Sequence, residues 1–430
     1  MNGFLRFASA TNRLEVAWLA LWAATISFAH RTANESLSGA IDTTHLQRIG
    51  FVAVAFLLVA STAGSLRRPR AEPLTLFLIY GVIALASVLW SASPVATAGK
   101  AAELLVAVLV VWQTARLADA PRLLLRLVDW TLLFNGVLLA VALVGYAVAP
   151  QIFSEPSRGV FRYQLAAPYM SSNAVAVLGA TLAVVALARF LSLRPGDGRR
   201  GFHAVVALGF AAFPFLAQGR TGIAILAVGV SILMLRRRPS LATLIVFPAV
   251  AAVGVMMLTE LATFVVRGQN VNQVETLSGR TALWDLALDG VAASPWVGYG
   301  FGVGGREAFA TVGLEGFGDT ISSVHNGPLE VLLGLGVLGF AVWLPAVLWG
   351  LWQAARALLA DRELDLAILV VPWLARTVMS IGLGGWLDPM VGTFLAATTY
   401  FAMMRRAERV RPPPRAANFA MPRRADPRRP

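Results

Sequence analysis

The feature that most constrains this chain is a series of apolar runs, each close to the roughly twenty residues that a helix needs to cross a bilayer. The chain has 430 residues, of which 57% are hydrophobic and 14% are charged. A soluble protein of this length would carry more charge. We therefore predict an all-α polytopic membrane protein with about twelve transmembrane helices. The predicted spans are 14–30, 49–66, 73–91, 101–116, 130–149, 172–190, 202–217, 221–235, 241–259, 328–352, 364–382 and 384–404.

Basic residues orient these spans. In a soluble chain, the formal charge of +13 would suggest nucleic-acid binding. Here most of the 36 Lys and Arg residues lie at the termini and in every second connection, as expected of cytoplasmic segments. We therefore expect no nucleic-acid partner and predict that both termini are cytoplasmic. The first run follows Arg6 and Arg13 and could be a cleaved signal peptide, but its basic stretch is long and its cleavage signature is weak.

The connections divide the chain into four parts. Residues 1–259 hold the first nine predicted spans, and residues 328–404 hold the last three. Between them, residues 260–327 form by far the longest outer loop, whose own short helical signals favour a functional loop over a linker. Residues 405–430 are rich in Pro and Arg, and we predict a disordered basic tail that rests on anionic membrane lipids.

Several kinds of chemistry lack the residues they need. The chain has no cysteine, which excludes disulfides, thiolate nucleophiles and cysteine-bound metals. No Asp-x-Asp pair and no cluster of His and Asp falls on the predicted outer face, so we predict no metal site and no cofactor. The sequence has no phosphate-binding loop, which leaves a nucleotide-driven pump without support.

The long outer loop contains a predicted helix and a run of glycines. Ser278 is placed to cap a helix that ends just before Pro295. Arg280 then lies in the first helical turn, where the helix dipole disfavours a cation unless an anion also binds. The following glycines, including Gly298 and Gly300, allow a close approach to a ligand, although a plain turn explains them equally well.

Two further basic residues lie at predicted helix starts. Asn326 is a good N-cap for the tenth span, with Pro328 in its first turn, so His325 lies at the mouth of that helix. A single histidine is more often a structural hydrogen-bonding group than a catalyst. Arg220 lies in an outer turn, where an interfacial anchor is the simpler explanation, yet an outward arginine runs against the charge bias. Together Arg220, Arg280 and His325 suit the binding of a diphosphate.

Weaker candidates extend this site. Glu330, one turn into the tenth span, could orient His325 or accept a proton. Arg376 lies inside the eleventh apolar run, where an ion pair with Asp388 near the outer leaflet is the default explanation. Trp284 and the other tryptophans are most simply interfacial anchors. The residues predicted to bind substrate are Asn326, Arg158, Arg162, Asn173, Gly298, Gly300, Glu330 and Arg376, with Asn173 opening the sixth span.

Three motifs in the second half of the chain resemble a known signature. SGRTALW, PWVGYGFG and HNGPLEVLLGLGVLG resemble, in order and spacing, the bacterial O-antigen ligase and polymerase superfamily, which includes lipopolysaccharide O-antigen ligases and exopolysaccharide polymerases. AQGRTG at 217–222 is similar to its shorter arginine motif, and SSN at 171–173 to its Asn-bearing helix start. The motifs GRT-x-LW, GYG and HNG resemble the exopolysaccharide-polymerase branch more closely. The stretch RYQLAAPYMSSN, by contrast, departs from the His-Lys-Asn that this branch usually has near its sixth helix.

The resemblance implies a metal-independent glycosyltransferase of the bacterial inner membrane with its active site on the periplasmic face. The implied donor is an undecaprenyl-diphosphate-linked glycan, and the implied acceptor is a saccharide or a lipid A-core. Polysaccharide export or assembly proteins are the expected protein partners. Arg220, Arg280 and His325 lie at the family's functional positions. The two arginines would neutralise the diphosphate leaving group, and His325 would orient or deprotonate the acceptor hydroxyl.

Two other classes of function fit the residues. A transporter or flippase for a glycolipid or other anionic substrate also has many spans and few embedded charges, but it should gather its polar groups near the bilayer midplane. A non-catalytic assembly scaffold predicts that alanine at Arg220, Arg280 and His325 leaves glycan production intact.

Overall fold

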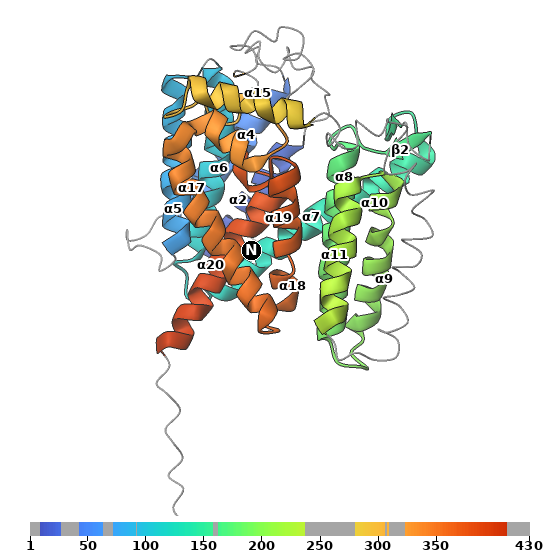
Figure 1. Ribbon diagram of the computed structural model, residues 1–430. Helices are drawn as coiled ribbons and strands as arrows, with labels where there is room; N and C mark the ends of the chain where they lie inside the picture. The colour runs from blue at the N-terminus through green and yellow to red at the C-terminus, as the bar shows by residue number, and fades with distance from the viewer. Residues whose placement is uncertain are drawn as a thin grey trace, which may run out of the picture.

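The computed structural model describes residues 9–26, 43–62, 72–91, 93–157, 162–236, 280–305, 308 and 323–410 (Figure 1). Helices dominate these ranges, which confirms the mostly helical fold class. The longer helices are α2 (Ala10–Thr25), α4 (Thr43–Ala60), α5 (Glu72–Ala86), α6 (Pro94–Thr114), α7 (Ala120–Val148), α8 (Ser172–Ser192), α9 (Arg199–Ala211), α11 (Arg220–Arg236), α15 (Arg280–Ala293), α17 (Gly327–Leu359), α19 (Val370–Met379) and α20 (Pro389–Val410). The short elements are η1 (Ser87–Leu89), β1 (Ser154–Pro156), β2 (Tyr163–Leu165), α10 (Phe213–Leu216), α18 (Leu364–Ala367) and η2 (Gly382–Gly384).

Four of the described helices, α6, α7, α8 and α17, are long and apolar enough to cross a membrane. The predicted count of about twelve spans is not confirmed, because several apolar runs form shorter or divided helices. The run 202–217 is divided between α9 and α10, where Pro214 lacks the N–H that a continuous helix needs. The ninth predicted span, 241–259, lies outside the described residues. α20 continues to Val410, past the predicted start of the tail at Arg405.

Tryptophans form part of the core, although the sequence had suggested interfacial anchors. Trp18 Nε1 donates to Thr131 Oγ1 at 2.9 Å, and Trp373 Nε1 donates to Thr393 Oγ1 at 3.0 Å. Helix-to-helix hydrogen bonds of this kind let an indole be buried without leaving its N–H unsatisfied. The fully buried tryptophans are Trp18, Trp22, Trp343 and Trp373.

The helix bundle has two ends, a His325 end and an Arg189 end. The His325 end, drawn at the top of Figure 1, is where α8, α11 and α17 begin and where α15 lies. The Arg189 end, at the bottom, is where α8 and α11 finish and where α20 ends. The charge pattern predicts that the Arg189 end faces the cytoplasm, and this assignment stays a prediction.

Ion pairs between different helices gather at the Arg189 end. Arg189 on α8 pairs with Asp129 on α7 and, at 2.9 Å, with Asp365 on α18. Arg126 on α7 pairs with Glu15 on α2 at 2.7 Å. Such pairs bring distant parts of the chain together at this end. Two more pairs there are Arg236 with Asp361 and Arg362 with Glu408.

Candidate functional site

The first turn of α17 presents His325. Asn326 caps α17 as predicted, because its Oδ1 accepts a hydrogen bond from the Leu329 N–H at 3.1 Å and Pro328 follows in the first turn. His325, directly before the cap, has a φ of 52°, in the left-handed region where histidine is enriched. Its backbone N–H donates to Ser323 Oγ at 3.0 Å. The half-buried His325 side chain is therefore held at a helix N-terminus.

Glu330 holds this turn from inside the helix. Its Oε1 accepts from the Val324 N–H at 2.6 Å, and the residue is only 8% exposed. The contact fixes the backbone that precedes His325. Glu330 can thus position His325 through the main chain, while its predicted contact with substrate stays a prediction.

α15 is bonded to the same turn. Trp284 Nε1 donates to the Val324 carbonyl at 3.0 Å. Gly290 of α15 lies so close to α17 that a Cβ placed there would be 3.1 Å from Leu333 Cδ2. Trp284 therefore connects the long outer loop to the start of α17, which is a more specific role than an interfacial anchor.

α15 begins at Arg280 and finishes before Pro295, as predicted. Trp284 is four positions after Arg280, which is about 6 Å along a helix axis. The Arg280 backbone thus lies about one helical turn from Trp284, whose indole donates the hydrogen bond to the segment before His325. The Arg280 side chain and the predicted cap Ser278 lie outside the described residues.

A break inside α17 receives the glycine-rich turn that follows α15. Gly336 has a φ of 61° and is not helical, so the helical ladder is interrupted there. Backbone groups on both sides of the break pair instead with residues 295–300. Tyr299 N–H donates to Leu333 O at 2.8 Å, Gly300 N–H to Gly334 O at 2.9 Å, Val337 N–H to Pro295 O at 2.8 Å, and Leu338 N–H to Trp296 O at 3.2 Å. The turn and the helix therefore share one backbone network.

This network explains two of the glycines. A Cβ at Gly298, whose φ is 63°, would lie 2.4 Å from the Leu333 carbonyl oxygen. A Cβ at Gly300, whose φ is 115°, would lie 2.5 Å from Ser91 Oγ. Both residues are buried against protein, so the structure supports a packing role for them. Their predicted contact with substrate stays a prediction.

The neighbouring Tyr299 is fixed in its protonated form. Its hydroxyl donates to the Gly290 carbonyl at 3.0 Å, which joins the turn to α15. Partial burial raises the pKa of the Tyr299 hydroxyl, because the phenolate is poorly solvated there. The bond from Tyr299 to α15 therefore persists across neutral pH.

Lys100, the chain's only lysine, holds the other side of the turn and is not among the residues predicted from the sequence. Its Nζ lies 2.6 Å from the Gly302 carbonyl oxygen and 4.0 Å from the centre of the Trp386 ring. A basic residue in a predicted outer connection runs against the charge bias in the same way as Arg220 does. That signal would have identified Lys100 from the sequence.

Arg220 begins α11, as predicted, beside the start of α8. Gly219 and Gly222 allow this close approach. A Cβ at Gly219 would lie 2.1 Å from Ala176 Cβ, and a Cβ at Gly222 would lie 2.5 Å from the Ala176 carbonyl oxygen. A Cβ at Gly219 would also lie 4.0 Å from Asn173 Oδ1. Arg220 and Asn173 therefore belong to neighbouring helix starts.

The start of α8 differs in detail from the prediction. Ser171 caps the helix by accepting from the Ala174 N–H at 3.4 Å, and Asn173 lies in the first turn instead of opening the helix. Ser and Asn are both strong N-caps, so three consecutive candidates at 171–173 do not define the cap from sequence alone.

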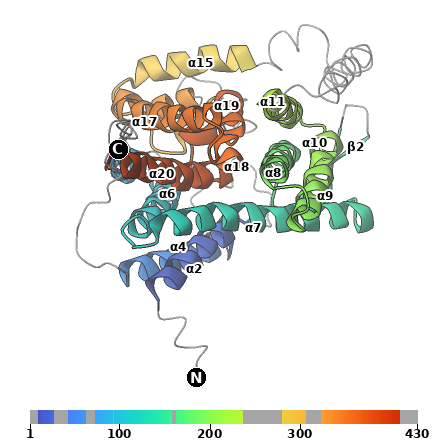
Figure 2. The same ribbon diagram turned by 90° about the horizontal axis from the view of Figure 1, so that it is seen from below.

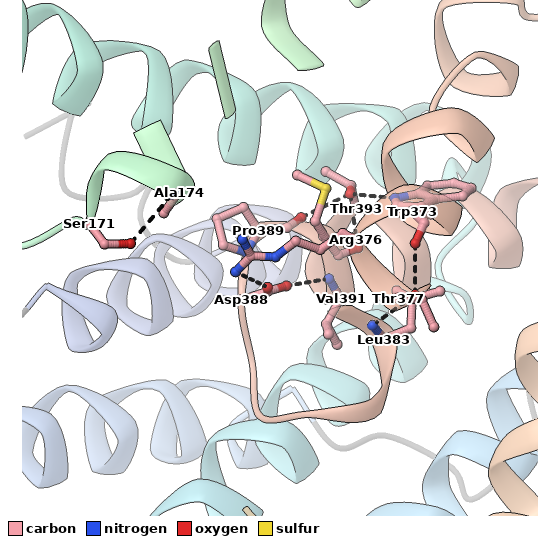
Figure 3. A network of polar contacts seen from close by, with 11 residues as sticks. Ser171, Ala174, Trp373, Arg376, Thr377, Leu383, Asp388, Pro389, Val391 and Thr393 are labelled. Carbon is pink, nitrogen blue, oxygen red and sulfur yellow. Dashed lines mark hydrogen bonds and ion pairs between the residues drawn. The ribbon is translucent and has the colours of Figure 1, made fainter. Parts of the chain in front are cut away.

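Arg376 pairs with Asp388, as predicted (Figure 3). Arg376 Nη2 lies 3.6 Å from Asp388 Oδ2, and the side chains are 17% and 18% exposed. Asp388 Oδ1 also accepts from the Val391 N–H at 2.8 Å and thereby stabilises the start of α20. The buried Arg376 Nε has no hydrogen-bond acceptor among the described residues. One carboxylate therefore serves both a guanidinium and a helix start.

Helix packing makes these groups neighbours. Val177 of α8 and Ile225 of α11 pack together with Ala375 of α19. Gly327 of α17 lies so near the end of α19 that a Cβ there would be 2.9 Å from the Thr377 carbonyl oxygen. The starts of α8, α11 and α17 and the end of α19 are therefore contiguous at the His325 end (Figures 1 and 2).

Arg162 lies apart from this arrangement. It is exposed at the start of β2, and its guanidinium is 5.6 Å from the centre of the Tyr163 ring. The antiparallel β1–β2 hairpin reaches α8 through Gln164 Nε2, which donates to Ser172 Oγ at 2.9 Å. Arg158 lies outside the described residues. The structure thus connects the hairpin, but not the Arg162 side chain, to the start of α8.

The electrostatics of the His325 end favour an anion. The backbone N–H groups at the starts of α8, α11 and α17 carry partial positive charge, and Arg220 adds a full charge. Within the described ranges, no three His, Asp or Glu side chains are grouped as a metal ion would need. Independence from metal stays a prediction.

Comparison with known proteins adds one finding. Residues 203–344 match a family described as O-antigen ligase. The matched region runs from α9 into α17 and contains Arg220, Arg280 and His325, whereas Asn173 and Arg376 lie outside it. No curated protein matches the chain in sequence. The family match confirms the predicted resemblance to the O-antigen ligase and polymerase superfamily, and it implies a membrane function of that type.

Proposed function

We propose that this chain, which carries the O-antigen ligase match, is a membrane glycosyltransferase that moves an undecaprenyl-diphosphate-linked glycan to a saccharide or lipid A-core acceptor. One observation carries the proposal. Arg220 and His325 lie at the starts of α11 and α17, and α15, which begins at Arg280, is bonded to the His325 turn. Helix starts with basic side chains suit a diphosphate leaving group.

The proposed reaction breaks one bond and forms another at the anomeric carbon. The acceptor hydroxyl attacks that carbon, and the diphosphate departs with the electron pair of the broken carbon–oxygen bond. Arg220 and Arg280 neutralise the departing charge. His325 orients the acceptor hydroxyl or takes its proton. The diphosphate is a good leaving group, so the reaction needs no further energy source or cofactor.

The remaining predicted residues take supporting roles in this proposal. Asn326 and Glu330 hold the His325 turn, as their hydrogen bonds to Leu329 and Val324 suggest. We place Asn173 and Arg376 at the edge of the anion site because their helices are packed against α11. Arg158 and Arg162 would contact the glycan further out, and Gly298 and Gly300 would support the site through their close packing against α17 and Ser91.

The proposed setting is the bacterial inner membrane, with both termini in the cytoplasm and the His325 end in the periplasm. The excess of basic residues in alternate connections supports this orientation. Surrounding membrane lipids and polysaccharide export or assembly proteins are the expected partners. A lipid-linked glycan can then reach the His325 end from within the bilayer.

Reconstitution tests the proposal directly. The full-length protein in vesicles is mixed with lipid-linked glycan and acceptor in the presence of EDTA, and glycan transfer is followed by gel or mass spectrometry. We expect turnover without added metal. Turnover that is lost in EDTA and restored by a divalent ion would overturn metal independence. Movement of the glycolipid across the bilayer without transfer would instead indicate a transporter or flippase.

The Arg280→Lys variant tests the role of a bidentate guanidinium. We expect it to lose about a hundredfold in turnover, because an ammonium cannot make the paired contacts of a guanidinium with a diphosphate. Arg199→Lys at the exposed Arg189 end is the matched control and should behave like the wild type. Near-normal activity of Arg280→Lys would make Arg280 a structural residue.

Glycan analysis of a deletion strain separates the two members of the proposed class. Loss of polymer with accumulation of single repeats would identify a polymerase. Intact polymer retained on its lipid carrier would identify a ligase. Unchanged glycan in a strain that carries alanine at Arg220, Arg280 and His325 would indicate a scaffold.

A further inference from the structure

The helices α7, α8 and α9 lie side by side (Figure 2), and a groove separate from the His325 end lies between them. Its volume of about 490 Å³ is within the range of small-molecule sites. Apolar residues line most of it, including Leu133 and Val137 on α7, Leu182 on α8 and Phe210 on α9. The charged and titratable lining residues are Arg126, Asp129, Arg189 and His203.

These polar residues gather at one end of the groove. Arg126 and Asp129 belong to the first part of α7, and His203 belongs to the first part of α9. Arg189 belongs to the last turn of α8, which runs in the opposite direction. All four therefore lie at the Arg189 end, and the apolar lining continues toward the middle of the bundle. A membrane-exposed groove with one charged end matches a lipid, which has a polar headgroup and an apolar chain.

The charge balance selects the kind of headgroup. Arg126 pairs with Glu15, and Arg189 is shared by Asp129 and Asp365. These three ion pairs hold three carboxylates and two guanidiniums, so the paired groups leave no excess positive charge for a purely anionic headgroup. The Arg126 and Asp129 side chains are 51% and 52% exposed, so each retains free surface for a further partner.

We propose that this groove binds one zwitterionic phospholipid with a primary ammonium headgroup, as in phosphatidylethanolamine. The lipid phosphate lies against Arg126, the ammonium lies against Asp129, and one acyl chain follows Leu133, Val137 and Phe210. A primary ammonium donates hydrogen bonds to a carboxylate, which a trimethylammonium group cannot do. A glycerol headgroup has no positive charge for Asp129.

Native mass spectrometry of the full-length protein tests this site. The detergent-purified protein is offered equal amounts of phosphatidylethanolamine, phosphatidylcholine and phosphatidylglycerol, and the lipids that remain bound are identified. We expect one retained phosphatidylethanolamine, preferred about tenfold over each of the others. Equal retention of all three lipids, retention of none, or preference for phosphatidylglycerol would overturn the proposal.

Asp129→Asn tests the headgroup contact. Arg189 keeps its 2.9 Å partner Asp365 in this variant, so the ion pair between α8 and α18 survives. We expect the preference for phosphatidylethanolamine over phosphatidylcholine to disappear while total lipid retention falls only partly. An unchanged preference would contradict the assignment of the ammonium to Asp129.

Gly136→Leu tests the groove itself. A Cβ at Gly136 lies 3.5 Å from Phe210 Cζ and 3.7 Å from Leu182 Cδ1, so a leucine there fills the groove. Gly209→Leu on α9 is the matched control, because its Cβ meets nothing within 4 Å. We expect only Gly136→Leu to lose the bound lipid. Size-exclusion chromatography checks folding, and Val137→Trp replaces Gly136→Leu if that variant does not fold. Wild-type retention by a folded groove-filled variant would overturn the site.

Discussion

The two ends of the molecule differ in the groups that surround their arginine side chains. At the Arg189 end, the guanidiniums of Arg126, Arg189 and Arg236 each meet a carboxylate on another element. At the His325 end, Arg220 begins a helix, and Arg376 shares Asp388 with the start of α20. The first arrangement is an ion-pair network. The second combines Arg220 at a positive helix start with an ion pair between Arg376, in the last turn of α19, and Asp388.

We expect this difference to distinguish structural charges from functional ones. Ion pairs between side chains join helices, so their loss lowers the free energy of unfolding. A cation at a helix start is disfavoured by the dipole, and a bound anion offsets that unfavourable term. Arg48, which pairs with Glu103 at 2.8 Å near the His325 end, follows the structural pattern. Position alone therefore does not decide the role of an arginine, and its partners must be considered.

The two ends of α11 provide the largest expected contrast. Arg220→Ala should lower turnover by about a hundredfold to a thousandfold, because a charge that stabilises the leaving group is lost. Arg236→Ala, at the other end of the same helix, removes the ion pair with Asp361, whose side chain is exposed. It should change stability by less than about 1 kcal/mol and leave turnover per folded protein unchanged. Equal loss of turnover in both variants would break the comparison.

Gly336→Ala tests the backbone network that supports the His325 end. A Cβ at Gly336 would lie 2.3 Å from the Trp296 carbonyl oxygen, and the φ of 61° is unfavourable for alanine. The free energy of unfolding should fall by about 2–4 kcal/mol, measured by thermal denaturation in detergent. Gly50→Ala on α4, where a Cβ meets nothing within 4 Å, should be neutral or stabilising. Equal melting temperatures for the two variants would contradict the close packing at Gly336.

Arg189→Met tests the ion-pair network at the other end. The substitution leaves Asp129 and Asp365 facing each other without their shared guanidinium. We expect a loss of about 1–3 kcal/mol, which is moderate because all three side chains retain solvent contact. Turnover per folded protein should stay near that of the wild type. A large loss of turnover with unchanged stability would place function at the Arg189 end as well.

Trp284→Phe should have the smallest effect. The ring remains, but the hydrogen bond from the indole N–H to the Val324 carbonyl is lost. We expect about 0.5–1.5 kcal/mol lower stability and a turnover reduced by a few fold, since α15 is less firmly joined to the His325 turn. Trp296→Phe provides the control, because Trp296 is 67% exposed. A thousandfold loss in Trp284→Phe would give Trp284 a direct part in the reaction.

Local signals in the sequence predicted much of this structure. The Asn326 cap, the helix that starts at Arg280 and the helix that starts at Arg220 follow from residue preferences within one or two turns. Arg376 and Asp388 were also paired correctly, because two charges in neighbouring apolar runs have few other partners. The roles of the site residues themselves stay predictions.

Long-range backbone pairing was beyond the sequence. The run from Gly298 to Gly305 was equally compatible with a ligand-binding loop and a plain turn, since glycine spacing does not reveal which backbone approaches it. The break at Gly336 carries no signal of its own in an apolar helix. Lys100 was detectable from its charge alone, but its contact with Gly302 depends on how α6 meets a turn some two hundred residues later.

The hydrogen bonds exchanged across the break in α17 have a consequence for biosynthesis. The carbonyl groups of Leu333 and Gly334 and the N–H groups of Val337 and Leu338 bond to segment 295–300. In hydrocarbon these backbone groups would have no other hydrogen-bond partner. We therefore expect α17 not to be stable in the bilayer while the groups at its break lack segment 295–300. Segment 295–300 precedes α17 in the chain and is therefore synthesised first. We expect the His325 turn to form only after this segment has reached its place against α17.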